Sequence, residues 1–390
     1  MRLPDAVAAI DRRIPRPNDF RSPARGTRTA ARVGLLLGTC IGICFLTGVW
    51  SHFQYTSPGW LPIGPDPAWL YRVTQGAHVA TGTAAIPLLL VKLWSVYPRL
   101  FRRPRKRGIR AFTVGGLERA SVALLVAAVV FQLVTGSLNV VQWYPWSFSF
   151  RATHEAVAYL AIGALLTHIA VKLPLVRIAL NRTVDDRLSL ASDGPSRRTV
   201  VLGAAAASGL AVLLTAGQTV PFLRRASVFG VRDGDGPQDL PVNRTARAAG
   251  AIDGATDPDF ALELRHGTRT VRLSRAQLAE LPQRTHRLPI TCVEGWSRNA
   301  TWTGIAVRDL VALVQAEPES VVRVRSMQTR GAFSASELPA DFVADPRTLL
   351  ALELNGEPLS LDHGYPCRII APNRPGVLQT KWVNSLEVPA

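Results

Sequence analysis

Residues 291–297 read TCVEGWS, and residues 302–310 a little further on read WTGIAVRDL. The single cysteine, Cys292, is followed by a glutamate, a glycine and a tryptophan, a composition that is poor for a hydrophobic core. Residues 288–292 predict a strand, so the cysteine stands where a strand runs into a loop. Thiolate sulfur in such a place suits a soft metal site. Spacing alone leaves two other interpretations, a buried free thiol or a disulfide with Cys367.

Short apolar segments continue on both sides of Cys292 and predict a soluble domain over residues 255–390. Glycines and prolines between 222 and 254 predict a linker before it. The periodicity predicts short helices over 275–281 and 307–314 and strands over 260–264, 270–273, 288–292, 321–325, 351–354, 367–370 and 381–383. Many short strands with small helices indicate a β-rich α+β domain.

The first half of the chain is hydrophobic in a different way. Five apolar stretches of about twenty residues are long enough to cross a membrane; they cover 33–53, 74–95, 118–138, 153–176 and 200–221. We expect a basic tail over 1–32, a four-helix membrane domain over 33–180 and a fifth transmembrane helix within 196–221. The Arg-rich, polar start predicts that no cleavable signal peptide precedes the first span.

The formal net charge of +17 at first suggests a nucleic-acid partner. However, residues 1–221 hold 25 Lys and Arg against 9 Asp and Glu, whereas residues 222–390 hold 20 against 19. The basic excess therefore belongs to the hydrophobic half, and no nucleic-acid-binding motif is present. We expect membrane lipid, and not nucleic acid, to be the partner of this charge.

Basic residues also predict the orientation of the spans. The tail to Arg32 carries eight Arg, the segment 99–110 carries seven basic residues and the segment 172–198 carries six, against one each in the other two loops, Arg72 and Arg151. The positive-inside rule places the N-terminus in the cytoplasm and residues 222–390 outside. Tryptophans and tyrosines in the weakly charged loops predict an interfacial belt on the outer side.

Two adjacent arginines, Arg197 and Arg198, precede the fifth span. Such a pair resembles a twin-arginine export signal, here internal, although it is also an ordinary positively charged flank. A domain that folds around a cofactor in the cytoplasm would need export in the folded state.

The motifs that begin at residue 291 continue in a fixed order. Residues 355–359 read NGEPL, residues 362–368 read DHGYPCR, and Gly376 and the pair Lys381-Trp382 follow. Over about residues 255–388 this series resembles the molybdopterin-binding domain of the sulfite oxidase family. The resemblance implies a molybdenum-molybdopterin cofactor, with Cys292 as the protein ligand of the metal beside the dithiolene of one molybdopterin.

The same resemblance implies roles for other residues. His363, Arg368 and Lys381 fall where the family holds the pterin and its phosphate, which suits a bidentate guanidinium and a point-charge amine. Ser326 or Thr329 would lie near the pterin, and Asn243 and Arg244 are candidates for an N-terminal contact. Arg330 and Tyr365 would help to hold an oxyanion or a sulfoxide. For the charged residues the alternative is an ordinary surface charge.

The family's second, immunoglobulin-like dimerisation domain is not expected in this chain. The architecture therefore resembles that of the compact bacterial members, such as the periplasmic methionine sulfoxide reductase, whose redox partner is a separate membrane haem protein.

Four histidines lie in or beside the spans, where ionisable residues indicate function. His154 and His168 are 14 residues apart, which returns a helix to within about 40° of the same face some ~21 Å further along. This pattern resembles a four-helix cytochrome b in outline. His78 and His154, both in the outer half, are expected to bind one haem b. His168 would serve a second haem and His52 is an alternative ligand, unless these histidines only hydrogen-bond within the bundle.

These interpretations predict a membrane-bound oxidoreductase. Its extracytoplasmic molybdenum centre would exchange electrons with haem b and with a quinone or another carrier. The small substrate would be an S- or N-oxide that is reduced, or sulfite that is oxidised. One alternative is a membrane-anchored, non-catalytic binding or assembly subunit with a degenerate molybdopterin fold. Another is an enzyme whose helical bundle lacks haem and serves only as an anchor.

Overall fold

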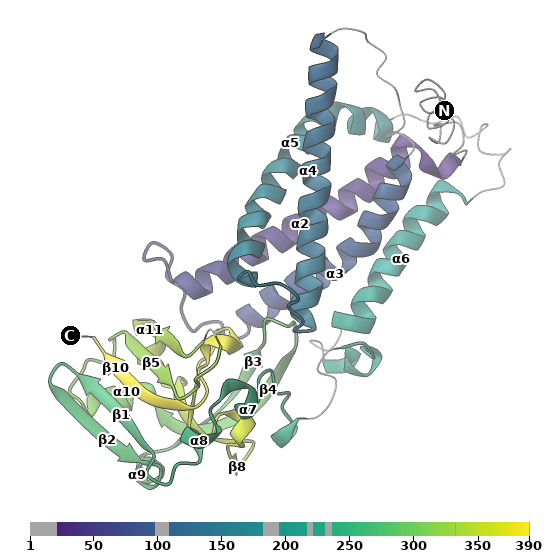
Figure 1. Cartoon of the computed structure of the whole chain (residues 1–390). Coiled ribbons are helices and arrows are strands. Elements are labelled where there is room, and N and C mark those ends of the chain that lie inside the picture. Colours follow the sequence, from purple (N-terminus) through teal and green to yellow (C-terminus); the bar gives the residue numbers. More distant parts are fainter. Residues whose placement is uncertain are drawn as a thin grey trace, which may run out of the picture. The chain divides into compact units, whose positions relative to one another are not determined.

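The computed structural model describes residues 22–97, 109–181, 195–216, 221–230, 236–331 and 333–389 (Figure 1). Most of the expected basic tail and the basic segment 99–108 lie outside these residues. The chain forms two compact units, one of residues 1–46 with 80–213 and one of residues 47–79 with 214–390. The second unit thus contains part of the first two predicted spans.

Five long helices follow one another in the first half of the chain. They are α2 (Thr27–Thr56), α3 (Leu70–Val96), α4 (Ile109–Val140), α5 (Phe150–Asn181) and α6 (Arg197–Ala216). All five are long and apolar enough to cross a membrane, which confirms the predicted helical membrane part. The last helix is described as far as Ala216, and residues Pro221–Ala226 form a 3-10 helix.

The helices of the first unit share one apolar core. Its buried residues include Val33 of α2, Leu88 of α3, Val129 of α4 and Ala204 of α6. Many other apolar side chains in the spans are exposed, as expected where lipid rather than protein covers a helix.

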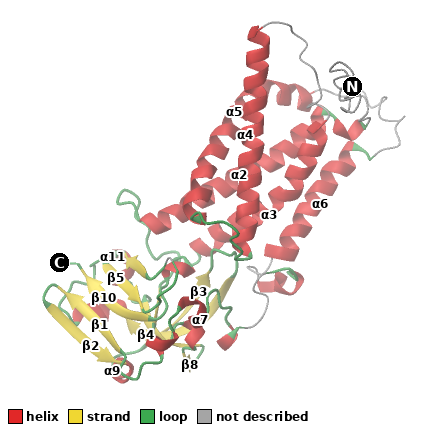
Figure 2. Cartoon of the chain, viewed as in Figure 1, coloured by secondary structure: helices red, strands yellow, loops and turns green. Residues whose placement is uncertain are grey.

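The C-terminal domain is built on two sheets (Figure 2, yellow). The first has the order β2 (Arg269–Ser274), β1 (Ala261–His266), β10 (Val383–Val388), β5 (Val322–Ser326) and β6 (Ala335–Leu338). The second has the order β3 (Arg284–Thr291), β4 (Ser297–Ala306), β7 (Leu349–Leu354) and β8 (Glu357–Pro358), and β9 (Arg368–Ile370) also pairs with β7. The short helices are α7 (Ala246–Ala249), α8 (Ile252–Ala255), α9 (Arg275–Glu280), α10 (Val307–Ala312) and α11 (Ala340–Ala344).

This arrangement confirms the predicted β-rich α+β fold. One core cluster joins the first sheet to short helices, with Val324 and Leu386 of the sheet beside Leu310 and Phe342. A second cluster contains Cys292 together with Trp296 and Trp302. The cysteine of the opening motif is therefore part of a packed wall and not of a free tail.

The structure differs from the expected segments in several places. Strands β4 and β6 and helix α11 were not expected, and the last strand runs over Val383–Val388 and not over 381–383. The segment expected to be a linker also packs on the domain, because Leu240, Ala246 and Ala249 are fully buried. Its turns, rich in glycine and proline, lie against the β-sheets, so residues 237–254 belong to the folded domain.

Candidate functional site

Cys292 lies at the tip of a β-hairpin. Strands β3 and β4 pair up to Thr291 opposite Ser297. Within the loop, the N–H of Cys292 donates to the carbonyl of Trp296 at 3.0 Å and the N–H of Gly295 donates to the carbonyl of Cys292 at 3.1 Å. The indole of Trp296 also donates to the buried carboxylate of Glu294 at 3.0 Å. These bonds fix the backbone that carries the thiol.

No disulfide joins Cys292 and Cys367, so the disulfide interpretation does not describe this structure. Cys367 is fully buried in the core and its thiol donates to the carbonyl of Val383 at 3.3 Å. Burial raises the pKa of the Cys367 thiol to about 12. Such a thiol is an apolar core residue, whereas Cys292 lines a pocket.

That pocket comprises about 290 Å³ of empty space, part of which is open to solvent. Its lining residues come from the expected linker, the cysteine loop and the C-terminal motifs, and they are Leu240, Pro241, Asn243, Ile290, Cys292, Trp296, His363, Arg368, Gly376 and Lys381. The fold thus brings Cys292 together with His363, Arg368 and Lys381, which were singled out from the sequence. Their roles at the cofactor stay predictions.

Arg368 is the most unusual of these residues, because its guanidinium is buried and forms no ion pair with a carboxylate of a described residue. The residue is 1% exposed and donates to the carbonyls of His363 at 3.0 Å and Gln379 at 3.2 Å. Its Nε atom has no hydrogen-bond partner, and no ion pair joins it to a described residue. Burial lowers the pKa of Arg368 to about 9. A buried cation of this kind is costly unless an anion completes it.

Lys381 is the second cation of the pocket. Its ammonium donates to the carbonyls of Asp362 at 2.7 Å and Arg244 at 3.0 Å. Burial, and next the charge of Arg368, lower the pKa of Lys381 to about 7. Gly364, at φ +108°, lets the two cations approach, because a Cβ there would lie 3.0 Å from the Cβ of Lys381 and 3.1 Å from that of Arg368.

His363 is held neutral beside these cations. Its Nε2 lies 2.7 Å from the carbonyl of Pro237, to which it donates. Burial and the charges of Arg368 and Lys381 lower the pKa of His363 to about 4. The imidazole therefore adds a fixed dipole, and not a charge, near neutral pH.

The composition of the pocket fits an anionic, phosphate-bearing cofactor with a metal. The buried Arg368 and the half-buried Lys381, neither in an ion pair with a described carboxylate, favour an anion, and Cys292 supplies one soft ligand. Among the described residues, no group of three or more His, Cys, Asp or Glu side chains could hold a metal ion. The sulfurs of a dithiolene are the kind of further ligand that a metal at Cys292 would accept.

The other residues expected near the cofactor lie elsewhere. Ser326 donates to the backbone carbonyl of Lys381 at 2.7 Å, so it supports the strand and does not line the pocket. The ring of Tyr365 faces the guanidinium of Arg275 at 5.9 Å. The backbone of Arg330 bonds to Ala249 and Arg244. Neither Arg330 nor Tyr365 is among the lining residues.

Sequence reasoning missed the wall that Leu240 and Pro241 form, and it named Asn243 only as a candidate. The carbonyl of Pro237 that orients His363 comes from the same segment. An isolated apolar Leu240 between two prolines was the only local signal that this segment is buried.

The C-terminal part of the chain is similar to known proteins. A family model described as an oxidoreductase molybdopterin binding domain matches residues 250–390. These residues form a molybdopterin-binding domain of the sulfite oxidase family. The resemblance stated from the sequence motifs is thereby confirmed for this part of the chain.

The relatives share only part of their length with this chain. The mitochondrial sulfite oxidase of Drosophila melanogaster is 27% identical over 33% of this chain and 27% of its own length. The catalytic subunit of protein-methionine-sulfoxide reductase MsrP from Gluconobacter oxydans is 32% identical over 31% and 43%. The uncharacterized oxidoreductase YuiH of Bacillus subtilis is 28% identical over 30% and 57%. The chain thus spans between a quarter and three fifths of these relatives.

The predicted haem histidines have similar local surroundings. Nδ1 of His78 lies 3.2 Å from the hydroxyl of Thr47, and Nδ1 of His154 lies 3.0 Å from that of Thr135. A glycine follows each threonine. A Cβ at these two glycines would lie 3.3 Å and 3.6 Å from Cε1 of the corresponding imidazole. Each imidazole therefore lies within hydrogen-bond distance of a threonine hydroxyl and packs against the glycine that follows that threonine.

The hydroxyl of Thr135 lies between two partners, the carbonyl of Phe131 at 2.7 Å and Nδ1 of His154 at 3.0 Å. When the hydroxyl donates to Phe131, it can accept from Nδ1, and the lone pair of the imidazole is then on Nε2. A metal ligand that binds through Nε2 requires this tautomer. His52 of α2 and His168 of α5 are both partly buried.

Proposed function

We propose that the chain is a membrane-bound, molybdopterin-dependent oxidoreductase whose metal is bound through Cys292. The observation that carries the proposal is the pocket in which this thiol meets the buried cation Arg368 and the half-buried cation Lys381, neither of which forms an ion pair with a described carboxylate. It lies in the domain that matches the molybdopterin-binding family. The thiol and the cations are the residue types that the metal and the phosphate of such a cofactor need.

The chain's own residues would bind and orient the cofactor. Arg368 would turn its unsatisfied Nε toward the anion, Lys381 would add a second charge, and the neutral His363 would hold its position through Pro237. Burial of Arg368 excludes water that would otherwise weaken its attraction for an anion. When bound, the molybdenum cofactor supplies two-electron or oxo-transfer chemistry, and the protein supplies orientation and electrostatics.

We further propose that the helices connect this site to electron carriers in the membrane. His78 and His154 would bind haem b through Nε2, supported by the threonine bonds to Nδ1. His168 and His52 are further candidates for a second haem or an alternative ligand. A quinone or another carrier would complete the circuit.

The catalytic domain would lie outside the cytoplasm, as the distribution of basic residues predicts. Arg197 and Arg198 are the first residues of α6. They would lie on the cytoplasmic side of this last span, which would also serve as the export signal. The substrate would be a small S- or N-oxide that is reduced, or sulfite that is oxidised.

Metal analysis of the purified full chain tests the proposal. We expect about one molybdenum per chain, and we expect the Cys292→Ser variant to lose it while remaining folded. Cys367→Ala is the matched control, because it removes a buried free thiol that lies outside the pocket. It should keep the metal and lose only some stability. A folded, metal-free wild-type protein from a molybdenum-replete host would favour the non-catalytic subunit instead.

A reduced-minus-oxidised spectrum tests the haem separately. We expect a b-type band that disappears in His78→Ala. A molybdenum-containing protein without that band would leave the helices as an anchor only.

A further inference from the structure

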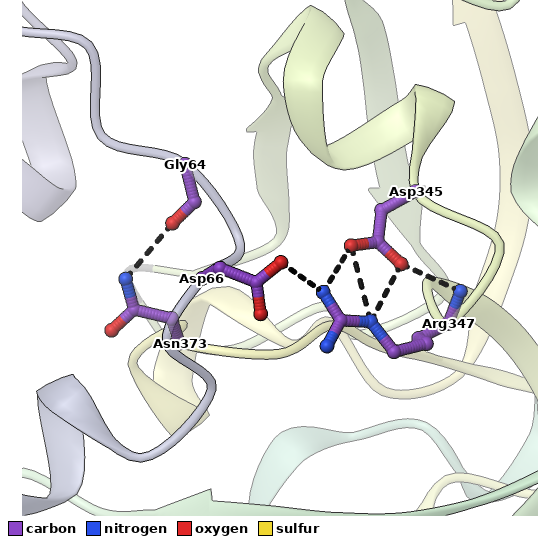
Figure 3. Close-up of polar contacts among 5 residues, drawn as sticks. All are labelled: Gly64, Asp66, Asp345, Arg347 and Asn373. Atoms are coloured by element: carbon purple, nitrogen blue, oxygen red, sulfur yellow. Dashed lines mark hydrogen bonds and ion pairs between the residues drawn. The ribbon is translucent and has the colours of Figure 1, made fainter.

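The segment Thr47–Val79, called here the outer hairpin, packs on the C-terminal domain within the second unit. Figure 3 shows two of its contacts. Asn373 donates from Nδ2 to the carbonyl of Gly64 at 2.9 Å, and Arg347 bridges Asp66 and Asp345. These bonds fix the loop that leads into α3.

Helix α3 then reaches the cysteine loop. Nε2 of Gln75 donates to the carbonyl of Val293, the residue after Cys292, at 3.0 Å. The hydroxyl of Tyr71 donates to Oε1 of Gln75 at 3.5 Å, which orients the amide. Gln75 is only 7% exposed, so this bond is shielded from water.

A second contact lies at the far side of the same loop. Gly295 adopts φ +93°, and a Cβ at this position would lie 2.9 Å from Cγ1 of Val79. The backbone of the loop therefore touches α3 so closely that only glycine fits. Gln75 and Val79 are four residues apart and therefore lie on one face of the helix. This face contacts the loop at two points.

His78 stands between these two contacts in sequence. Its ring is held by the hydroxyl of Thr47 at 3.2 Å and lies against Gly48. The turn of α3 that contacts the cysteine loop thus also carries His78, the proposed haem ligand. Only Val293 and the Gln75 side chain separate the backbone of Cys292 from this helix.

We propose that Gln75 is a positioning residue that fixes the Cys292 loop on the His78-bearing turn of α3. This inference rests on the proposed function, in which Cys292 and His78 are the ligands of two redox centres. With both cofactors bound, Cys292 and His78 would hold centres that exchange electrons singly, the donor being oxidised and the acceptor reduced by one electron. The covalent backbone of the loop, the bond from Gln75 to Val293 and one turn of helix form the connection between the two ligands.

The first test uses hydrogen exchange of the full chain in detergent, purified without molybdenum cofactor. Gln75→Leu keeps the volume and removes the bond, so we expect amide exchange of residues 293–296 to rise several-fold. Thr74→Val is the matched control, because its hydroxyl bonds only to Leu70 and Tyr71 of its own helix. It should leave exchange in the loop unchanged.

The second test uses the holoenzyme. The haem is photoreduced by a flash, and its reoxidation by the molybdenum centre is followed by absorbance. We expect the first-order rate to fall several-fold in Gln75→Leu at unchanged molybdenum and haem content, and to stay unchanged in Thr74→Val. A residue that served stability alone would not move this rate.

Val79→Ala decides the matter if Gln75→Leu fails to fold. It loosens the same loop without stranding a buried polar group, and we expect a smaller change of the same sign in both measurements. Unchanged exchange and an unchanged rate in the folded variants would overturn the inference and leave the proposed function intact. A wild-type protein without molybdenum or haem would instead overturn the proposed function.

Discussion

The side-chain oxygen of Asn373 accepts a hydrogen bond from the backbone N–H of Tyr71 at 2.9 Å, across 302 residues of sequence. Tyr71 is the second residue of α3, and the first N–H groups of a helix have no partner within it. Asn373 therefore caps a helix that begins far away in the chain. It does so at φ +51°, a conformation that asparagine tolerates better than most residues.

We expect Asn373→Ala to destabilise the second unit by about 2–4 kcal/mol, because it removes the cap and strains the backbone. Asn373→Gly removes the same side-chain bonds without strain and should cost about 1 kcal/mol less. Asn373→Asp keeps the acceptor for Tyr71 and should be the mildest of the three. Thermal unfolding in detergent and exchange of the Tyr71 amide measure these effects. An alanine variant as stable as the wild type would contradict the capping role.

Arg347 forms two ion pairs, one with an exposed carboxylate and one with a buried carboxylate, so the stabilities that the two pairs contribute can be compared. Arg347 lies 2.7 Å from Asp66, whose side chain is 70% exposed, and 2.6 Å from Asp345, whose side chain is 7% exposed. Asp66→Asn should therefore cost less than about 1 kcal/mol. Arg347→Met strands the buried carboxylate and should cost about 2–3 kcal/mol, a modest value because Arg347 itself is partly exposed.

The pH dependence of this cluster has a definite sign. Burial would raise the pKa of Asp345, but the bonds from the side chain and backbone of Arg347 outweigh it and hold the pKa below the usual value. The pair therefore stabilises the fold fully above about pH 4, and this stability is lost as the pH falls through the lower pKa of the folded state. The deficit of Arg347→Met relative to wild type should shrink in acid. A deficit that grows in acid would show that the pair is not responsible.

Pocket residues that stand in recognisable sequence motifs could be predicted from the sequence. Pocket residues that reach the site only through contacts with distant parts of the chain could not. Cys292, Arg368 and Lys381 stand in short motifs whose order carries the resemblance. Strand β4 was missed because it follows the cysteine loop with the polar residues Arg298 and Asn299, although Arg298 is 5% exposed. Its neighbours on both sides, β3 and β7, bury it, and local periodicity does not reveal that.

The outer hairpin illustrates the same limit on a larger scale. Its apolar residues predict a membrane span correctly, but the bonds of Gly64 and Tyr71 to Asn373 join positions about 300 residues apart. Composition likewise predicted a linker around Leu240, where glycines and prolines form turns that pack on the domain. Local signals predict that a turn forms, but they do not predict what covers it.

Thr135 offers a test of the haem ligands that leaves them in place. Its hydroxyl lies 3.0 Å from Nδ1 of His154, and a hydrogen bond donated by Nδ1 would increase the basicity of the imidazole toward a metal at Nε2. Thr135→Val should keep the haem and raise its reduction potential, because a less basic ligand stabilises the ferric form less. Potentiometric titration of the b-type band measures the shift. Thr167→Val, next to His168, is the control, since this hydroxyl bonds to Gly163 of its own helix.

If the haem of Thr135→Val titrated at the wild-type potential while His154→Ala lost haem, the threonine bond would be without electronic effect. If His154→Ala kept its full haem content, His154 would not be a ligand at all.

Anion binding to the cofactor-free pocket should depend on pH through Lys381. Burial and Arg368 lower the pKa of this amine to about 7, so it loses its proton near neutrality when no anion is present. An anion favours the charged form, and binding therefore takes up a proton. We expect inorganic phosphate to stabilise the cofactor-free chain more at pH 6 than at pH 8, as measured by the shift in thermal midpoint at a fixed phosphate concentration.

His363 does not interfere with this measurement, because its pKa of about 4 keeps it neutral across the range. Lys381→Met should bind phosphate more weakly and should lose the preference for pH 6, whereas Arg368→Met should bind weakly but keep it. Phosphate itself gains negative charge as the pH rises, so binding by Lys381→Met should strengthen toward pH 8. A wild type whose stabilisation changes with pH in the same way as that of Lys381→Met would show that Lys381 does not titrate in the pocket as its surroundings predict.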